Sequence, residues 1–316
     1  MVSSLMAPST SCGIHMIKSA TQAEARHDHV GPETILSMTE SDRYPTVFEE
    51  DERSRSQFVR GILRAESSED TLMDPDLEAT ARIPRRLVRF WHDAGAVPDD
   101  VRACMATWDQ VAEAGFELHT FDDASAAAYI ADVYGANESA AFSLCAHPAM
   151  RCDYLRLCFV LAEGGLYVDA DDAFLCGDLV KLLDDPKLKV QPLGYDIAKG
   201  RMMTNDEVWR DDLDDQERVF YVNNNPIAAP ANHPLLARAL ARSTNRLLSG
   251  DPHLEIQATT GPGNLTAALV GHARALDLQG RPRDFELLRD WPSVAQTRWD
   301  LRYRSDDRNW RNVYRC

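Results

Sequence analysis

Two aspartates near the middle of the chain have the spacing to hold a divalent cation. Asp169 and Asp171 directly follow the apolar run 166–168. If that run is a strand that continues into the acids, residues two apart face the same way, so both carboxylates point into one space. Carboxylates this close repel each other unless a positive charge lies between them, and a hard cation that also binds phosphate is a common answer. The spacing therefore predicts a site for Mn²⁺ or Mg²⁺, although a solvated acidic turn is the alternative.

The segment before these acids carries a second group of charges. Residues 149–163 predict one buried helix, because a proline precedes them and two glycines follow. Asp153 and Arg156 are three residues apart and share one side of this helix, whereas Arg151 points nearly the opposite way. An internal ion pair explains Asp153 and Arg156 most simply. Their place just before the acidic strand suggests instead that helix and acids build one site.

The combined pattern resembles the signature of a known enzyme family. It reads Arg151-x-Asp153-x-x-Arg156 and then Gly164-Gly165-x-Tyr167-x-Asp169-x-Asp171. This is similar to the DXD-containing sugar transferases of glycosyltransferase family 32, and the same spacing occurs in the large glucosylating toxins. The resemblance covers roughly residues 83–271. It implies a GT-A fold, which is an α/β fold with a mainly parallel sheet and helices on both faces, and a retaining hexosyltransferase that uses a nucleotide sugar.

The resemblance also implies roles for the charged residues. Asp171, and with it Asp169, would bind the metal that neutralises the departing diphosphate. Asp153 and Asp169 would contact ribose and donor-sugar hydroxyls, and Arg156 would bridge sugar and phosphate. The donor is expected to be a UDP-sugar rather than GDP-mannose, and the acceptor is unknown.

Aromatic and amide residues complete the expected site. Trp91 matches a family aromatic that stacks on the nucleotide base, although a tryptophan after a strand can equally be core. Asn225 closes an asparagine cluster that could contact sugar hydroxyls or form a turn. Trp310 is the nearest equivalent of a C-terminal family tryptophan, and Asp307 and Asn309 beside it are candidates for further metal ligands.

Two other kinds of function fit part of the pattern. A phosphohydrolase could use Asp169 as nucleophile and Asp171 as acid, but such enzymes place Thr or Val two positions later, where this chain has Ala173. A catalytically inactive module that binds sugar nucleotides is the second alternative. The acids, the arginine and the glycines are all present, and this favours the transferase.

Composition narrows the partners and the compartment. The 316 residues carry a formal net charge of −16, which argues against a nucleic-acid partner. The seven cysteines form no C-x-x-C pair, as is typical of free thiols in a reducing compartment. The longest apolar run, 157–162, is too short to span a membrane, and the start of the chain does not look like a signal peptide. We therefore expect a cytoplasmic protein.

The order of the predicted elements gives the architecture. Residues 1–82 read as an acidic, partly disordered N-terminal extension, and residues 83–316 as the transferase domain. Within the domain, strands at 87–91 and 116–121 alternate with helical patterns, which predicts a mainly parallel sheet. Ligands of such sheets lie beyond the carboxyl ends of the strands, where Trp91 and Asp169 both fall.

Overall fold

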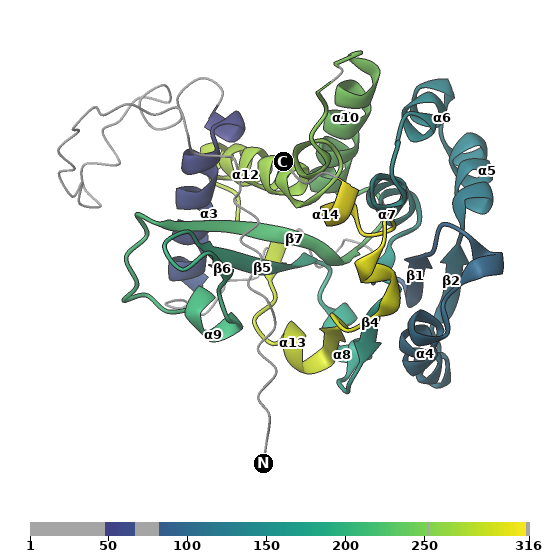
Figure 1. Ribbon diagram of the computed structural model, residues 1–316. Helices are drawn as coiled ribbons and strands as arrows, with labels where there is room; N and C mark the ends of the chain where they lie inside the picture. The colour runs from purple at the N-terminus through teal and green to yellow at the C-terminus, as the bar shows by residue number, and fades with distance from the viewer. Residues whose placement is uncertain (1–47, 67–81, 252, 314–316) are drawn as a thin grey trace.

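A seven-stranded mixed sheet forms the centre of the molecule (Figure 1). The structure is a computed structural model, and it describes residues 48–66, 82–251 and 253–313. The strand order is β2-β1-β3-β7-β5-β6, and β8 also pairs with β5. The strands of this sheet are β1 (Arg86–Phe90), β2 (Glu117–Phe121), β3 (Gly165–Tyr167), β5 (Leu188–Asp196), β6 (Arg201–Met202), β7 (Arg218–Ala229) and β8 (Phe285–Leu287).

Most strands of the sheet point the same way. β1 is parallel to β2 and β3, β7 is antiparallel to both β3 and β5, and β8 is parallel to β5. Thus β1, β2, β3, β5 and β8 share one direction, whereas β7 and β6 run against it. A separate two-stranded sheet joins β4 (Asp172–Phe174) to β9 (Ala295–Thr297). The predicted α/β fold with a mainly parallel sheet is therefore confirmed.

Helices cover both faces of the sheet, as expected (Figure 1). Their bounds are α3 (Glu52–Glu66), α4 (Asp99–Thr107), α5 (Asp123–Val133), α6 (Ala136–Ser143), α7 (Pro148–Glu163), α8 (Leu179–Asp184), α9 (Asn205–Val208), α10 (Pro234–Leu248), α11 (Ile256–Thr259), α12 (Pro262–Gln279), α13 (Trp291–Val294) and α14 (Trp310–Val313). Alternate strand residues feed two cores. Val88 packs in the larger core with α3, α7, α10 and α12, and its neighbour Leu87 packs on the other face with α8 and α13.

The glycine pair after α7 lets the chain turn directly into β3. Gly164 and Gly165 have φ values of 68° and 122°, which side chains rarely adopt. A Cβ on Gly165 would lie 2.6 Å from the carbonyl oxygen of Arg86 on β1. The two glycines therefore allow the helix that carries Asp153 and Arg156 to end beside the strand that precedes the acids.

Helix α3 belongs to the core, although its residues fall in the predicted extension. Val59, Ile62 and Leu63 are at most 1% exposed and pack in the larger core against the sheet. Arg60 is equally buried, and its guanidinium contacts Asp215 at 3.0 Å. The boundary predicted at residue 83 needs correction, because an amphipathic helix can pack on a sheet far along the chain. Residues 1–47 and 67–81 of the predicted extension lie outside the described residues.

The packing of α3 predicts a large effect on stability. Ile62→Ala should lower the free energy of unfolding by about 2–5 kcal/mol, because it leaves a cavity in the core. Gln57→Ala, at an exposed position of the same helix, should change it by no more than about 0.5 kcal/mol. Urea denaturation of both variants measures the difference. Equal, small effects would mean that α3 is an appendage.

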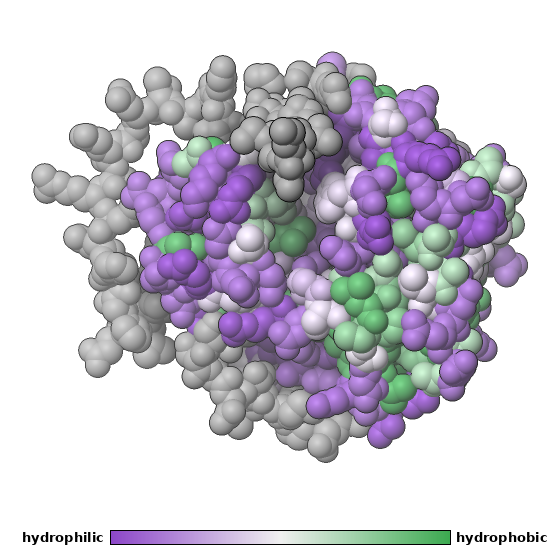
Figure 2. Space-filling view, turned by 60° about the horizontal axis from the view of Figure 1, so that its bottom comes forward, coloured by the Kyte–Doolittle hydropathy of each residue, from purple (hydrophilic) through white to green (hydrophobic). Residues whose placement is uncertain are grey.

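No helix in the described residues is long and apolar enough to cross a membrane. Figure 2 shows hydrophilic residues over most of one face, with hydrophobic groups in and beside a central hollow.

Candidate active site

A cavity of 730 Å³ lies beyond the carboxyl ends of β1 and β3. Four acids and four arginines are among the residues that line it, so these charges balance each other although the chain as a whole is acidic. Amides and aromatic rings form much of the remaining wall. Among these groups are the carboxylates of Asp153, Asp169, Asp171 and Asp172, the guanidinium groups of Arg156, Arg304, Arg308 and Arg311, the amides of Gln191, Asn223, Asn224 and Asn225, and the rings of Trp91, Tyr221, Trp291, Trp299, Tyr303 and Trp310.

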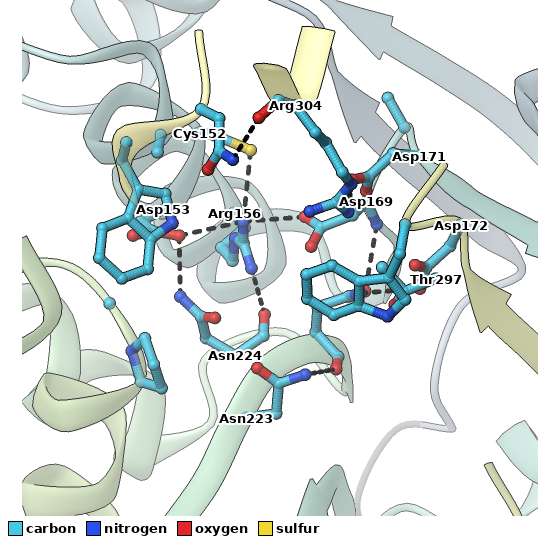
Figure 3. Close-up of a pocket in the computed structure, with 18 of the residues that line it drawn as sticks. Cys152, Asp153, Arg156, Asp169, Asp171, Asp172, Asn223, Asn224, Thr297 and Arg304 are labelled. Atoms are coloured by element: carbon cyan, nitrogen blue, oxygen red, sulfur yellow. Dashed lines mark hydrogen bonds and ion pairs between the residues drawn. The ribbon is translucent and has the colours of Figure 1, made fainter. Parts of the chain in front are cut away.

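Arg156 links the helix to the acidic segment (Figure 3). Its Nη2 lies 3.0 Å from Oδ1 of Asp153, one turn earlier on α7, and 3.0 Å from Oδ1 of Asp169 beyond β3. Its Nη1 donates to the backbone oxygen of Asn224 at 2.5 Å. The centre of the Tyr167 ring lies 4.2 Å from the guanidinium carbon of Arg156. The internal ion pair and the multi-residue site are therefore one arrangement.

Asp153 has further partners from distant parts of the chain. The side-chain amide of Asn224 donates to Asp153 at 2.8 Å, and the hydroxyl of Thr260 donates to it at 3.2 Å. Burial raises the pKa of Asp153 to about 6, because burial disfavours its charged form more than Arg156 and these hydrogen bonds favour it. Asp153 is thus held in one orientation at the cavity wall.

The acids after β3 lie on a turn rather than in an extended strand. β3 ends at Tyr167, and the backbone N–H of Asp172 donates to the backbone oxygen of Asp169 at 3.1 Å, which closes the turn. The prediction that Asp169 and Asp171 share one face of an extended strand is therefore wrong. Both residues nevertheless line the same cavity.

Asp171 is the more buried of these two acids. Its side chain is 11% exposed, whereas that of Asp169 is 31% exposed. Its Oδ2 accepts a hydrogen bond from Arg304 (Figure 3). The same oxygen accepts one from the hydroxyl of Tyr303. Burial raises the pKa of Asp171, and the nearby charge of Asp169 raises it further.

Asp172 is a buried acid for which the sequence suggested no role. It is 1% exposed, and the side-chain amide of Asn225 donates to its Oδ2 at 2.8 Å. The Asn225 side-chain oxygen accepts from the backbone N–H of Asp169 at 3.1 Å, so this asparagine holds the turn in place. Burial raises the pKa of Asp172 to about 7, and the charges of Asp169 and Asp171 add to that effect.

This raised pKa predicts how stability depends on pH. The folded-state pKa of Asp172 lies above its unfolded value of about 4, so its contribution to stability is present below about pH 4 and is lost as pH rises to 7. Asp172→Asn should therefore be stabilised relative to wild type at pH 8 by on the order of 1–3 kcal/mol more than at pH 5. Urea denaturation at both values, with the exposed Asp132→Asn as control, measures this. A difference independent of pH would contradict the expectation.

The structure brings some of the remaining predicted residues to the cavity. Trp91 lines it but is 8% exposed, with the Tyr303 ring edge-on at 5.2 Å, so its faces are largely covered by protein. Trp310 and Asn309 line the cavity as well. Asp307 is exposed and is absent from the wall; its backbone oxygen lies 3.0 Å from Nε2 of His147.

The predicted protein ligands do not assemble into a closed metal site. The described residues contain no group of three or more His, Cys, Asp or Glu side chains that could hold a metal ion. Magnesium, however, is often bound by one or two carboxylates together with phosphate oxygens of the substrate. Asp169 and Asp171 fit that second mode, and the Arg304 guanidinium already stands as a cation against Asp171. The donor set therefore fits a cation that a diphosphate completes.

Comparison with known proteins assigns no family. No family model matches the chain, and no curated protein matches it. The chain is similar to a solved structure titled PaToxG Glycosyltransferase, at 15% identity and a TM-score of 0.44, over 73% of this chain and 82% of that one. The resemblance to family 32 remains a prediction from the motif.

Several residues that line the cavity or contact its wall were not predicted from the sequence. Thr260 lies in a loop whose sequence suggests that backbone amides could face an anion. The contact of the Thr260 hydroxyl with Asp153 was not predicted. Tyr303 and Arg304 lie in a C-terminal stretch rich in arginine and aromatic residues, for which both diphosphate binding and closure of the sheet edge were open. That composition was the available signal. Asn224 belongs to the predicted asparagine cluster. Its contact with Asp153, 71 residues away in the sequence, depends on the tertiary structure.

Proposed function

We propose that this protein transfers a sugar from a nucleotide-sugar donor to an acceptor in the 730 Å³ cavity. The observation that carries the proposal is Arg156 held between Asp153 and Asp169, with Asp171 at the same wall. Carboxylates accept hydrogen bonds from sugar hydroxyls, and guanidinium groups bind phosphate. A nucleotide sugar carries both kinds of group, because a diphosphate joins the hydroxyl-bearing donor sugar to the hydroxyl-bearing ribose.

Each part of the donor has a complementary group in the cavity. Asp169, whose side chain is 31% exposed, has oxygen surface left to accept a hydroxyl of the sugar or ribose. Asp153 is oriented for the same task by Asn224 and Thr260. Arg156 lies between them, where it can contact sugar and phosphate together. A divalent cation held by Asp171 and Asp169 would supply charge neutralisation for the departing diphosphate.

The finer points of the proposal come from the motif and the composition. We propose a UDP-sugar donor in preference to GDP-mannose, Mn²⁺ or Mg²⁺ as cofactor, and transfer with retention of configuration. The net charge of −16 speaks against a nucleic-acid acceptor, and the acceptor class is open. The described cysteines are free thiols, in keeping with the proposed cytoplasmic location.

The phosphohydrolase alternative is less compatible with the geometry. Its nucleophile would be Asp169, but Oδ1 of this residue lies 3.0 Å from Arg156 and accepts from the Tyr167 hydroxyl at 2.9 Å. An ion pair and a hydrogen bond on one oxygen lower the nucleophilicity of a carboxylate. The same contacts are suited to holding Asp169 still while it binds a hydroxyl.

Nucleotide release from a panel of UDP- and GDP-sugars tests the proposal. We expect slow hydrolysis with Mn²⁺ for at least one donor and its loss in EDTA, because water can replace an absent acceptor. Phosphate release from simple monoesters would support the phosphohydrolase instead. Binding of UDP without release from any donor would support the inactive binding module and contradict the proposal.

A further inference from the structure

We infer that Arg304 is a built-in counter-cation of Asp171, which competes with a divalent cation for this carboxylate and, once displaced, binds the donor's diphosphate. The inference rests on the proposed function for the identity of the diphosphate. The competition itself concerns only the protein and a metal ion.

Arg304 and a metal ion would compete for one oxygen of Asp171. Arg304 Nη2 and the Tyr303 hydroxyl both contact Oδ2 of Asp171, and Arg304 reaches it across 133 residues of sequence. The side chains of Arg304 and Asp171 are 14% and 11% exposed, so water screens the pair weakly. A metal ion bound at the same oxygen would repel the guanidinium at close range. One of the two cations must therefore leave.

The surroundings of Asp171 explain why a cation is needed there at all times. Asp169 and Asp172 lie in the same turn as Asp171. The charge of Asp169 acts on Asp171, and the charges of both act on Asp172. Arg156 is the ion-pair partner of Asp169, and Arg304 is the ion-pair partner of Asp171. An unpaired buried carboxylate between two others would be strongly destabilising, so the pair fills a requirement of the fold without metal.

Arg304 also has supports that do not depend on Asp171. Its Nε donates to the backbone oxygen of Arg298 at 2.8 Å, and its guanidinium carbon lies 4.3 Å from the centre of the Trp299 ring. Both contacts would keep the side chain at the cavity wall after the ion pair breaks. A guanidinium presents two parallel N–H donors, which match the oxygens of a diphosphate. The freed group is therefore held in reach of the donor's charge.

Mn²⁺ binding to the full chain, followed by the EPR signal of free Mn²⁺ at pH 8, tests the competition. Arg304→Gln should bind Mn²⁺ about tenfold more tightly than wild type, a change of ~1.4 kcal/mol, because the competing charge is gone. A merely structural role would weaken binding instead. Arg302→Gln, an exposed arginine of the same 3-10 turn, is the matched control and should bind as wild type does.

A second pair of measurements tests the diphosphate step. With EDTA present, Asp171→Asn should bind UDP more tightly than wild type, because Arg304 is then released. The double variant Asp171→Asn, Arg304→Gln should lose this gain. Trp299→Ala removes the aromatic support of the freed guanidinium at a residue that is 62% exposed, so it should fold, and with Mn²⁺ present it should bind UDP less tightly than wild type.

Unchanged or weaker Mn²⁺ binding by Arg304→Gln would overturn the inference, as would no Mn²⁺ binding by any variant or unchanged UDP binding by Trp299→Ala with Mn²⁺ present. These titrations need no turnover. A protein that binds Mn²⁺ as expected but releases no nucleotide would therefore contradict the proposed function and leave the competition standing.

Discussion

Asp171→Asn should lower metal-supported nucleotide release by about 10²–10³-fold, a loss like that seen when one charge-stabilising group is removed from an active site. Asparagine keeps the shape of the side chain but not its charge, so the cation that neutralises the diphosphate is held less firmly. The fold should survive, because the substitution removes a buried carboxylate that lies near two others. Nucleotide release with saturating donor and Mn²⁺, and a melting curve, measure the two effects.

Asp307→Asn is the informative control for this experiment. Asp307 was a predicted metal ligand, but it is exposed and outside the cavity wall. The variant should release nucleotide within about twofold of wild type, since surface substitutions away from a site have small effects. If Asp171→Asn retained full turnover, the cation role of Asp171 would be refuted. If Asp307→Asn lost it, the C-terminal ligand assignment would be restored.

Arg156→Ala should lower the free energy of unfolding by about 3–5 kcal/mol, the cost of leaving a buried charge unpaired. Its side chain is 4% exposed and contacts both Asp153 and Asp169 at 3.0 Å, so its removal leaves two carboxylates facing each other. Arg151→Ala is the matched control on the other side of α7. Arg151 pairs with Asp123 at 2.7 Å where both side chains are partly exposed, and it should contribute no more than about 1 kcal/mol.

Urea denaturation at two pH values makes this prediction sharper. Without Arg156 the pKa of Asp153 should rise above its value of about 6, because burial still raises it and the Arg156 charge that lowers it is gone. A group with a raised folded-state pKa loses its stabilising contribution as pH rises, so the deficit of Arg156→Ala should be larger at pH 8 than at pH 5. Similar losses for Arg156→Ala and Arg151→Ala would show that the buried network contributes little to stability.

The local features of the site follow from neighbouring residues and were predictable. Proline and the glycine pair bound α7, and a spacing of three residues places Asp153 and Arg156 on one side of it. β1, β2 and α5 also lie where alternation and capping residues place them. Such features depend on backbone propensity and periodicity within a few residues, which a single sequence contains.

Contacts between distant segments were decided by the tertiary structure. Neighbouring residues were enough to predict that the acids and the helix charges meet near the end of β3. They did not predict that the acids form a turn, that α3 joins the core, or that Arg304 reaches Asp171 across 133 residues. Many arginines could have paired with Asp171 on charge alone. The choice depends on how the whole sheet and its helices close, because a buried ion pair forms only where packing brings its two members within reach.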